Sequence, residues 1–287
     1  MSITRRSVLL GLAAAPLGAC ASISPMELGA IGNRIDEGKV DFRALQQAAA
    51  RADDARLGDA DIRAKWPQTV RIASIDRVGV RYFVERDDRS RIQRVAFPGS
   101  ENVRDWVEDF DIFLRPDART GIPLHRGFEE ATTAAYADMR PHLRQAYAVE
   151  VAGYSMGAGL AAILTAYLTA DGFRVQRTTT FGQPRVTNAA GVQRLASLPI
   201  TRVVNSDDFV SMVPTFPFEH FGEEVILHPG PDYVYLTHAD ANRISIGELW
   251  RDVHRLVVEN HLMTTYRRRL DEKLQGARSV PYLTRLA

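Results

Sequence analysis

The stretch from Ala148 to Leu160, Ala-Val-Glu-Val-Ala-Gly-Tyr-Ser-Met-Gly-Ala-Gly-Leu, changes its hydrophobic pattern half-way along. Up to Gly153 the pattern is that of a buried strand, and beyond Met156 it is Ala- and Leu-rich with a helical period. The change falls on Ser155, which has a glycine two residues before it and another two residues after it, where a sharp strand-to-helix turn leaves no room for a Cβ atom. This pattern predicts that Ser155 is a nucleophile above the carboxyl edge of a sheet. The alternative is a glycine-rich turn with an incidental serine.

The composition of the chain sets limits on its class. It has 287 residues, of which 45% are hydrophobic, and a formal net charge of +1. A chain of this length can bury a large core, and its near-neutral charge argues against nucleic acid as a partner. Because no internal repeat or low-complexity block interrupts the sequence, we expect one α/β domain over residues 39–287.

The first twenty residues are expected to lie outside that domain. Arg5-Arg6 precedes a short apolar run, 8–17, which is too short to cross a bilayer and reads as an export signal over residues 1–19. The arginine pair resembles a twin-arginine signal, and Leu17-Gly18-Ala19-Cys20 resembles a bacterial lipobox. We therefore expect lipid attachment at Cys20, a tether over residues 20–38, and a location in the bacterial cell envelope. The alternative is a stray small residue at position 20, the only cysteine of the chain.

Strand and helix patterns alternate through the rest of the chain. Strands are expected at 70–75, 78–85, 92–97, 148–153, 175–181, 200–204, 224–227 and 233–236. Helices are expected at 41–56, 102–110, from 128 to about 145, 156–168, 189–195 and 246–274. This alternation predicts a largely parallel sheet flanked by helices, with ligands at the carboxyl ends of its strands, where Ser100, Ser155 and Asp208 fall.

The segment 102–110 carries an apolar stripe at helical spacing. Its members are Val103, Trp106, Val107 and Phe110, with charged residues at the positions between them. One interpretation is a lid that covers Ser155 in water and opens at a lipid surface. The other is a fixed wall whose stripe packs permanently into the core.

A serine nucleophile needs a histidine base and a carboxylate that orients the base. His125 and His142 precede Ser155, which is the wrong order for an α/β-hydrolase. Two later histidines, 254 and 261, share one face of the last helical stretch, so spacing alone cannot separate them. On the acid side, Asp207 and Asp208 are adjacent at a strand end.

Several segments together resemble the class 3 lipases, the fungal-type family of the α/β-hydrolase fold, between about Val95 and Tyr266. The segments that carry the resemblance are Val95-Ala96-Phe97-Pro98-Gly99-Ser100 with Asp105-Trp106 and Asp109, His125-Arg126-Gly127-Phe128, the serine turn, Thr180 to Asn188, Arg202 to Val210, and His261-Leu262-Met263 with Tyr266. The resemblance implies an α/β-hydrolase with Asp208 as the catalytic acid, and it favours His261 over His254 as the base. It also implies an oxyanion hole formed by the N–H groups of Ser100 and Met156.

The chain departs from the family pattern at three positions. Pro98 stands where arginine is usual, and Tyr154 and Met156 stand where histidine and leucine are common. None of these changes removes a catalytic group. Tyr154 and Met156 are expected to line the acyl cleft and so to affect specificity.

The resulting hypothesis is a carboxylic ester hydrolase that acts on lipid esters, similar to a triacylglycerol lipase, without a metal or cofactor. The histidines lack metalloprotease spacing, and the glycines of the serine turn are not followed by a P-loop lysine. A phospholipase, an aryl esterase and an acyltransferase would use the same three catalytic residues. A lipid-binding surface lipoprotein without turnover is the alternative from another class.

Overall fold

The computed structural model describes residues 29–31, 33, 35, 40–100, 113–242 and 258–282. The predicted export signal, Cys20, the helix 102–110 and His254 lie outside these residues. Within the described ranges, no helix is both long and apolar enough to cross a membrane.

The centre of the molecule is a nine-stranded sheet in the described part of the chain, with the order β1-β2-β3-β6-β7-β9-β11-β12-β13. The strands are β1 (Thr69–Ile75), β2 (Val80–Asp87), β3 (Ile92–Phe97), β6 (Ala148–Tyr154), β7 (Val175–Phe181), β9 (Ile200–Asn205), β11 (Glu223–Leu227), β12 (Asp232–Leu236) and β13 (Arg278–Ser279). The run from β3 through β11 is parallel, and β2 and β12 join its two ends antiparallel. Beyond them, β1 pairs antiparallel with β2, and β13 pairs parallel with β12. The prediction of a mostly parallel sheet is therefore confirmed.

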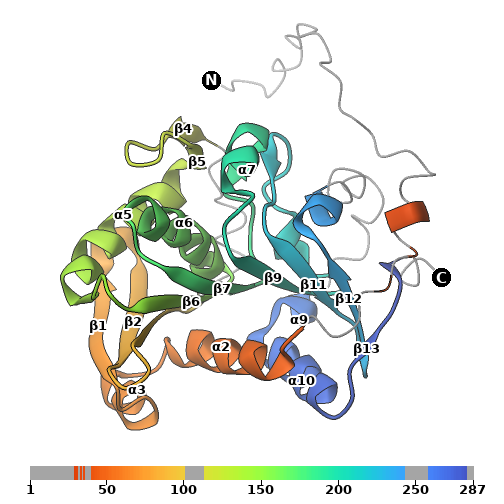
Figure 1. Ribbon diagram of the computed structural model, residues 1–287, viewed down its shortest axis with the longest axis horizontal. Helices are drawn as coiled ribbons and strands as arrows, with labels where there is room; N and C mark the ends of the chain where they lie inside the picture. Colours follow the sequence, from red (N-terminus) through yellow and green to blue (C-terminus); the bar gives the residue numbers. More distant parts are fainter. Residues whose placement is uncertain are drawn as a thin grey trace, which may run out of the picture.

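Helices cover both faces of the sheet (Figure 1). On one face lie α5 (Arg126–Met139), α6 (Met156–Ala170) and α7 (Ala189–Leu195), and on the other lie α2 (Phe42–Asp54), α9 (Val258–His261) and α10 (Met263–Leu274). The short helix α3 (Asp59–Lys65) packs near β1 at the edge of the sheet. This three-layer arrangement buries both faces of the central strands.

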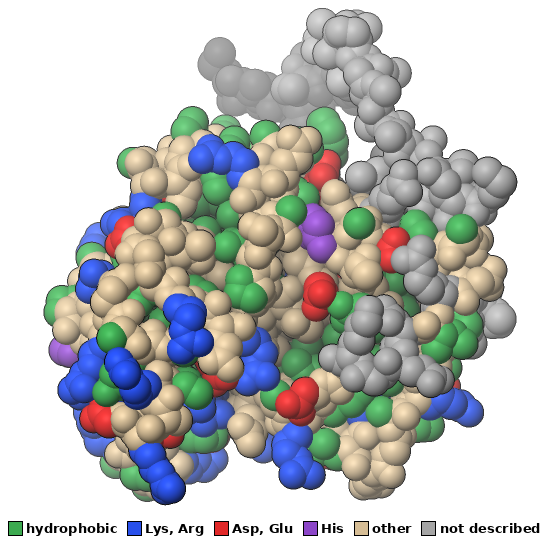
Figure 2. Space-filling view, in the orientation of Figure 1, with side chains coloured by type: hydrophobic (Ala, Val, Ile, Leu, Met, Phe, Trp, Pro, Cys, Tyr) green, Lys and Arg blue, Asp and Glu red, His purple; other side chains and the backbone are tan. Residues whose placement is uncertain are grey.

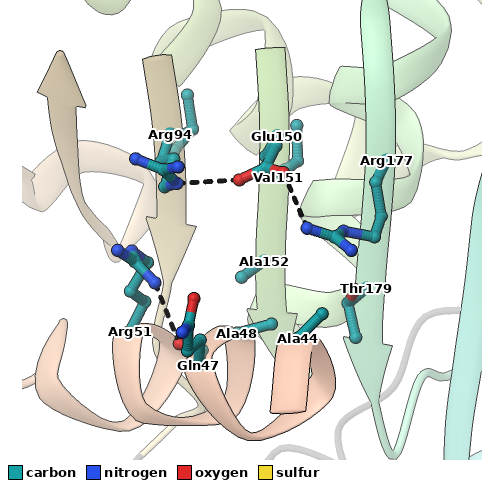
Figure 3. Close-up of a pocket in the computed structure, with 11 residues that line it drawn as sticks. Ala44, Gln47, Ala48, Arg51, Arg94, Glu150, Val151, Ala152, Arg177 and Thr179 are labelled. Atoms are coloured by element: carbon teal, nitrogen blue, oxygen red, sulfur yellow. Dashed lines mark hydrogen bonds and ion pairs between the residues drawn. The ribbon is translucent and has the colours of Figure 1, made fainter. Parts of the chain in front are cut away.

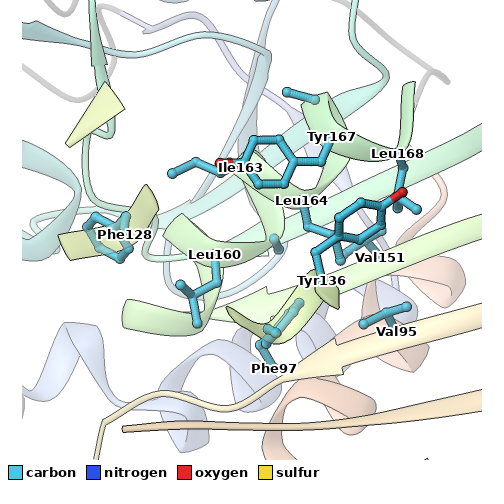
Figure 4. Close-up of a cluster of buried hydrophobic side chains, with 14 of the residues drawn as sticks. Val95, Phe97, Phe128, Tyr136, Val151, Leu160, Ile163, Leu164, Tyr167 and Leu168 are labelled. Atoms are coloured by element: carbon cyan, nitrogen blue, oxygen red, sulfur yellow. The ribbon is translucent and has the colours of Figure 1, made fainter. Parts of the chain in front are cut away.

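The sequence of β6 is almost continuously apolar because both faces of this strand are buried. Val149 and Val151 point into the core under α5 and α6, whereas Ala152 and Tyr154 belong to the core under α2 and α10. Figure 4 shows Val151 and other strand side chains packed against the side chains of α5 and α6. Because α6 is buried from Gly157 to Leu168, it is apolar around its whole circumference.

A second, smaller sheet was not predicted. It has the order β10-β8-β5-β4 and consists of β4 (Leu114–Pro116), β5 (Pro123–His125), β8 (Thr187–Asn188) and β10 (Phe218–Glu219). Strands of two or three residues are too short to show an alternating pattern. The sequence therefore contained no periodic signal for them.

Three helical segments differ from the prediction. The helix expected to reach Gln145 ends at Met139, because Pro141 follows in a 3₁₀ turn and cannot continue the backbone hydrogen bonds. The helix expected over 246–274 breaks at Leu262, whose ψ of 135° is extended, and this break separates α9 from α10. The helix α3 lies in a stretch interpreted as a polar connection.

The visible surface carries charges of both signs (Figure 2). Arginine and lysine side chains lie among acidic ones, in keeping with a net charge of +1.

Candidate active site

Ser155 occupies a strained turn between β6 and α6. Its φ and ψ angles are 55° and −123°, in a region that non-glycine residues rarely adopt. The Ser155 N–H donates to the Phe181 carbonyl at 2.9 Å, and the Ser155 carbonyl accepts from Ala158 N–H at 2.9 Å, which begins α6. The backbone on both sides of the serine is thus fixed, and the turn has the form that the sequence predicted.

The glycines that flank the serine are needed sterically. A Cβ atom on Gly153 would lie 2.2 Å from the Gly157 carbonyl oxygen, and one on Gly157 would lie 2.2 Å from the Pro98 carbonyl oxygen. Since no side chain tolerates such contacts, only glycine fits at either position. This packing explains the glycines under either interpretation of the turn, so the role of the serine depends on its side-chain partners.

His261 bridges Ser155 and Asp208. Its Nε2 lies 2.9 Å from the Ser155 Oγ, and its Nδ1 lies 3.0 Å from each carboxylate oxygen of Asp208. Because a carboxylate only accepts hydrogen bonds, the Nδ1 carries the proton and the Nε2 is left to accept from the serine hydroxyl. The three side chains are buried, with residue exposures of 0% for Ser155, 1% for His261 and 2% for Asp208.

The loop after β9 and the C-terminal end of α9 bring the acid and the base together. Asp208 follows β9 and caps the 3₁₀ turn Phe209–Met212, where its Oδ1 accepts from Val210 N–H at 2.9 Å. The Asn205 side chain donates to the Asn260 carbonyl at 2.7 Å and so ties the end of β9 to α9. This contact places the His261 segment, 53 residues further along the chain, beside the acid.

Tyr266 completes the surroundings of the acid. Its hydroxyl donates to Asp208 Oδ2 at 2.5 Å and accepts from Asn205 N–H at 3.1 Å. Complete burial, together with the nearby Asp208 carboxylate, raises the pKa of Tyr266 well above its usual value. The phenol therefore stays protonated and remains a donor to the acid. Sequence reasoning named Tyr266 only as part of a resembling segment and assigned it no contact.

The glycine at the end of β7 is a second feature that sequence reasoning missed. Gly182 has a φ of +56°, and a Cβ atom there would lie 2.8 Å from both Asp208 Oδ2 and His261 Nδ1. Its missing side chain makes room for the acid and base pair.

The two predicted oxyanion donors belong to segments that adjoin Ser155. Met156 is the first residue of α6, where backbone N–H groups have no partner within the helix. Ser100 follows Gly99, and a Cβ atom on Gly99 would lie 3.1 Å from the Ser155 Cβ. The end of the β3 segment thus reaches the serine, as the proposed oxyanion hole requires.

The other candidates have different outcomes. His125 is the N-cap of α5 and accepts from Phe128 N–H, so its position is accounted for by capping. Asp207 has a φ of 65° and is partly exposed, unlike the buried Asp208.

Some predicted residues lie outside the described part of the chain. They are the stripe Val103, Trp106, Val107 and Phe110, the lipid-attachment candidate Cys20, and His254. In the described ranges, no cluster of histidine, cysteine and carboxylate side chains could hold a metal ion.

A separate hollow lies between α2 and the strands β3, β6 and β7 (Figure 3). Glu150 lies between two arginines and accepts from Arg94 Nε and from Arg177 Nη2, both at 2.7 Å. Glu150 precedes Ser155 by five residues, or roughly 15 Å along a strand. The lining residues include no member of the Ser155 site, so this hollow is not where the serine would meet a substrate.

Part of the chain also matches a known protein family. Residues 94–218 match the family model "Lipase (class 3)". That segment includes Ser100, Ser155 and Asp208, whereas His261 lies beyond it. The resemblance inferred from motifs is therefore supported over this part of the chain.

Individual relatives agree with the family match. The chain is 30% identical over 166 residues to the secreted mono- and diacylglycerol lipase 1 of Fusarium solani, covering 54% of this chain and 50% of the relative. It is also 30% identical over 174 residues to a lipase of Rhizomucor miehei, covering 55% of this chain and 48% of the relative. The chain thus spans about half the length of the curated relatives that it matches.

The solved structure of lipase II from Rhizopus niveus is similar over a larger part of the chain. Its TM-score is 0.65 at 19% identity, and the alignment covers 79% of this chain and 95% of that chain. The predicted α/β-hydrolase fold is confirmed.

Proposed function

We propose that the protein is a serine carboxylic ester hydrolase that acts on lipid esters, with Ser155 as nucleophile, His261 as general base and Asp208 as the orienting acid. The observation that carries this proposal is the imidazole of His261, which bridges the Ser155 Oγ and the Asp208 carboxylate. A buried serine with this partner at this distance is arranged for acyl transfer.

The reaction follows from the positions of the protons. His261 Nε2 takes the proton of Ser155 as the Oγ attacks the ester carbonyl carbon and forms the tetrahedral intermediate. The imidazolium then donates that proton to the departing alkoxide, which leaves an acyl-enzyme on Ser155. Water, deprotonated by the same Nε2, then attacks the acyl carbon, and the second tetrahedral intermediate collapses to release the carboxylic acid as the imidazolium returns its proton to the Ser155 Oγ. Asp208 stays ionised and stabilises the imidazolium in both halves of the reaction.

The oxyanion of the intermediate would be held by the N–H groups of Met156 and Ser100. The start of α6 supplies the partial positive charge of a helix N-terminus, and the Gly99 backbone brings its neighbour Ser100 close to the serine. Removal of one such donor in other hydrolases costs about 2.7–4 kcal/mol.

The substrate class rests on the relatives rather than on the geometry of the catalytic residues. One similar protein is named a mono- and diacylglycerol lipase, and another is named a lipase. Lipid esters are accordingly the first substrates to test. Phospholipids and aryl esters are the alternatives within the same chemistry, and an alcohol in place of water would make the protein an acyltransferase.

The test uses the purified full chain in detergent and a panel of substrates. The panel contains short- and long-chain p-nitrophenyl esters, di- and triacylglycerols and phosphatidylcholine, each with and without an added alcohol as acceptor. We expect Ser155→Ala and His261→Ala each to lower kcat by about 10⁴-fold or more, because the three residues act as a unit. Retention of a tenth of the activity by either variant would reject the assignment, and binding without turnover by the wild type would favour a lipid-binding protein.

We propose also that the protein is exported and anchored to a membrane of the bacterial cell envelope by lipid attached to Cys20. The lipobox-like sequence that precedes Cys20 supports this proposal. A single acyl chain binds a membrane only marginally, so stable anchoring requires more than one chain on the mature protein. We expect Cys20→Ser to leave an unacylated form that moves to the aqueous phase in detergent partition. Identical partition of wild type and variant would contradict the anchor.

A further inference from the structure

Tyr154 lies directly before the proposed nucleophile and contacts the proposed base. Its ring stacks on the imidazole of His261, with centroids 5.1 Å apart and an interplanar angle of 27°. Its hydroxyl donates to the His261 carbonyl at 2.8 Å. One side chain of the serine turn thus holds both the backbone and the ring of the histidine, which lies 107 residues further along the chain.

The hydrogen bond from Tyr154 to the His261 carbonyl lies at the C-terminal end of α9, where the backbone hydrogen bonds of the helix stop. The helix α9 ends at His261, and Leu262 is extended, with φ −60° and ψ 135°. Carbonyl groups at a helix end lack a partner within the helix, and a buried carbonyl without a partner is costly. The Tyr154 hydroxyl supplies the partner for the His261 carbonyl and so fixes the backbone from which the imidazole projects.

The ring of Tyr154 is itself held tightly. A Cβ atom on Gly99 would lie 2.6 Å from its Cδ1 atom, and its ring makes a T-shaped contact with the ring of Tyr266, with centroids 6.4 Å apart. The ring therefore fills the space between the end of the β3 segment and the histidine. Burial, reinforced by the Asp208 carboxylate, raises the pKa of Tyr154 above its usual value, so that its hydroxyl remains a donor.

We infer that Tyr154 is a positioning residue for the hydrolysis proposed above: it sets the distance and orientation of His261 relative to Ser155 through the hydrogen bond to the His261 carbonyl and the stacked ring. The inference rests on the proposed function. It differs from the expectation that Tyr154 lines the acyl cleft, because its contacts are with the base. The face of the ring also lies against the group that becomes positively charged in the reaction, an arrangement that favours a cation.

Two substitutions separate the two contacts. Tyr154→Phe keeps the ring and removes the hydroxyl, and we expect kcat on a soluble ester to fall about five- to tenfold with KM unchanged, as for the loss of one hydrogen bond. Tyr154→Leu removes both contacts, and we expect a fall of about 30- to 100-fold in kcat, since the imidazolium also loses the ring.

The matched control is Tyr136→Phe. Tyr136 is a buried phenol on α5 whose hydroxyl donates to Asp171 at 2.5 Å. Deleting this hydroxyl measures the general effect of losing a buried phenol hydrogen bond, and we expect kcat to stay within about twofold of wild type. Thermal unfolding of all three variants reports any loss of folded protein.

A second readout does not depend on turnover. The His261 Nδ1 proton, which lies between the ring and Asp208, should give a low-field proton resonance. We expect that resonance to shift or broaden in Tyr154→Phe and to remain unchanged in Tyr136→Phe. A merely structural tyrosine would change the Tm and leave the resonance in place.

Two results would overturn the inference. One is a kcat for Tyr154→Phe within twofold of wild type with an unchanged resonance. The other is a fall in kcat for Tyr154→Phe that equals the fall in kcat for Tyr136→Phe. In either case, an inactive Ser155→Ala variant in the same assay would leave the proposed function intact. An active Ser155→Ala variant would instead reject the proposed function.

Discussion

The Tyr266 hydroxyl donates to Asp208 Oδ2 at 2.5 Å and at the same time accepts from Asn205 N–H at 3.1 Å. One phenol therefore joins the proposed acid to the backbone at the end of β9. We predict that Tyr266→Phe lowers kcat about tenfold and destabilises the fold by about 1–3 kcal/mol, because a buried N–H and a buried carboxylate both lose a partner. Steady-state kinetics and urea unfolding measure the two effects. An unchanged kcat would show that the contact is structural only.

The acid can be assigned to one of two adjacent aspartates by matched amide substitutions. We predict that Asp208→Asn lowers kcat by about 10³- to 10⁴-fold, because an amide no longer favours the Nδ1-protonated tautomer of His261. Asp207→Asn should stay within about threefold, since Asn also tolerates the positive φ of Asp207. Kinetics on a soluble ester measure both variants, and the reverse order would move the acid by one residue.

Gly182 tests how much room the acid and base pair requires. We predict that Gly182→Ala lowers kcat by at least about 10²-fold, because its methyl group would lie 2.8 Å from Asp208 Oδ2 and His261 Nδ1. The control is Gly79→Ala, which has a similar φ of +61° but nothing within 4 Å of the new Cβ. Both variants carry the backbone strain, of roughly 1–2 kcal/mol. Equal activity of the two variants would contradict the crowding seen at Gly182.

Because His220 is buried, we predict that the folded protein loses stability in acid. Burial, helped by the positive charges of Arg202 and Arg185, lowers the pKa of His220 well below its usual value. Below about pH 6.5 the unfolded chain binds a proton at this position that the folded chain does not, so stability falls as the pH falls. This one group contributes a slope of up to about 1.4 kcal/mol per pH unit.

The variant His220→Gln isolates this contribution. Urea unfolding between about pH 5 and 7 should give a flatter pH dependence for the variant than for wild type. His142→Gln, at a partly exposed position in the 3₁₀ turn after α5, is the control for the same substitution away from this buried position. Parallel slopes for His220→Gln and wild type would show that His220 does not titrate as a buried group.

Much of the central sheet could be predicted because its strands and helices are long enough to show a hydrophobic period. The transition from β6 to α6 is the clearest case, since two glycines and a change of period coincide at Ser155. The small second sheet could not be predicted, because its strands have two or three residues and its β5–β8 and β8–β10 pairs join segments far apart in sequence. The break at Leu262 was missed because the helical period continues through it.

The residues of the candidate site likewise include some that the sequence could predict and some that it could not. Ser155 followed from its local motif, whereas Asp208 and His261 required the family resemblance, because the spacing of residues does not reveal which histidine folds back to the serine. The contacts of Tyr154 and Tyr266 arise from tertiary packing and have no local signal. The role of the stripe over 102–110 stays a prediction, since those residues are outside the described part of the chain.

The central claim is that Ser155 forms a covalent acyl-enzyme with the help of His261, and covalent trapping tests it most directly. The full chain is treated with diethyl p-nitrophenyl phosphate, an ester that phosphorylates serine nucleophiles, and the released p-nitrophenol and the labelled peptide are measured. We predict a burst of one equivalent of p-nitrophenol and one label, on the peptide that contains Ser155, with loss of labelling in Ser155→Ala and much slower labelling in His261→Ala. Labelling that persists in Ser155→Ala, or no labelling of the wild type under conditions where it hydrolyses esters, would contradict the account.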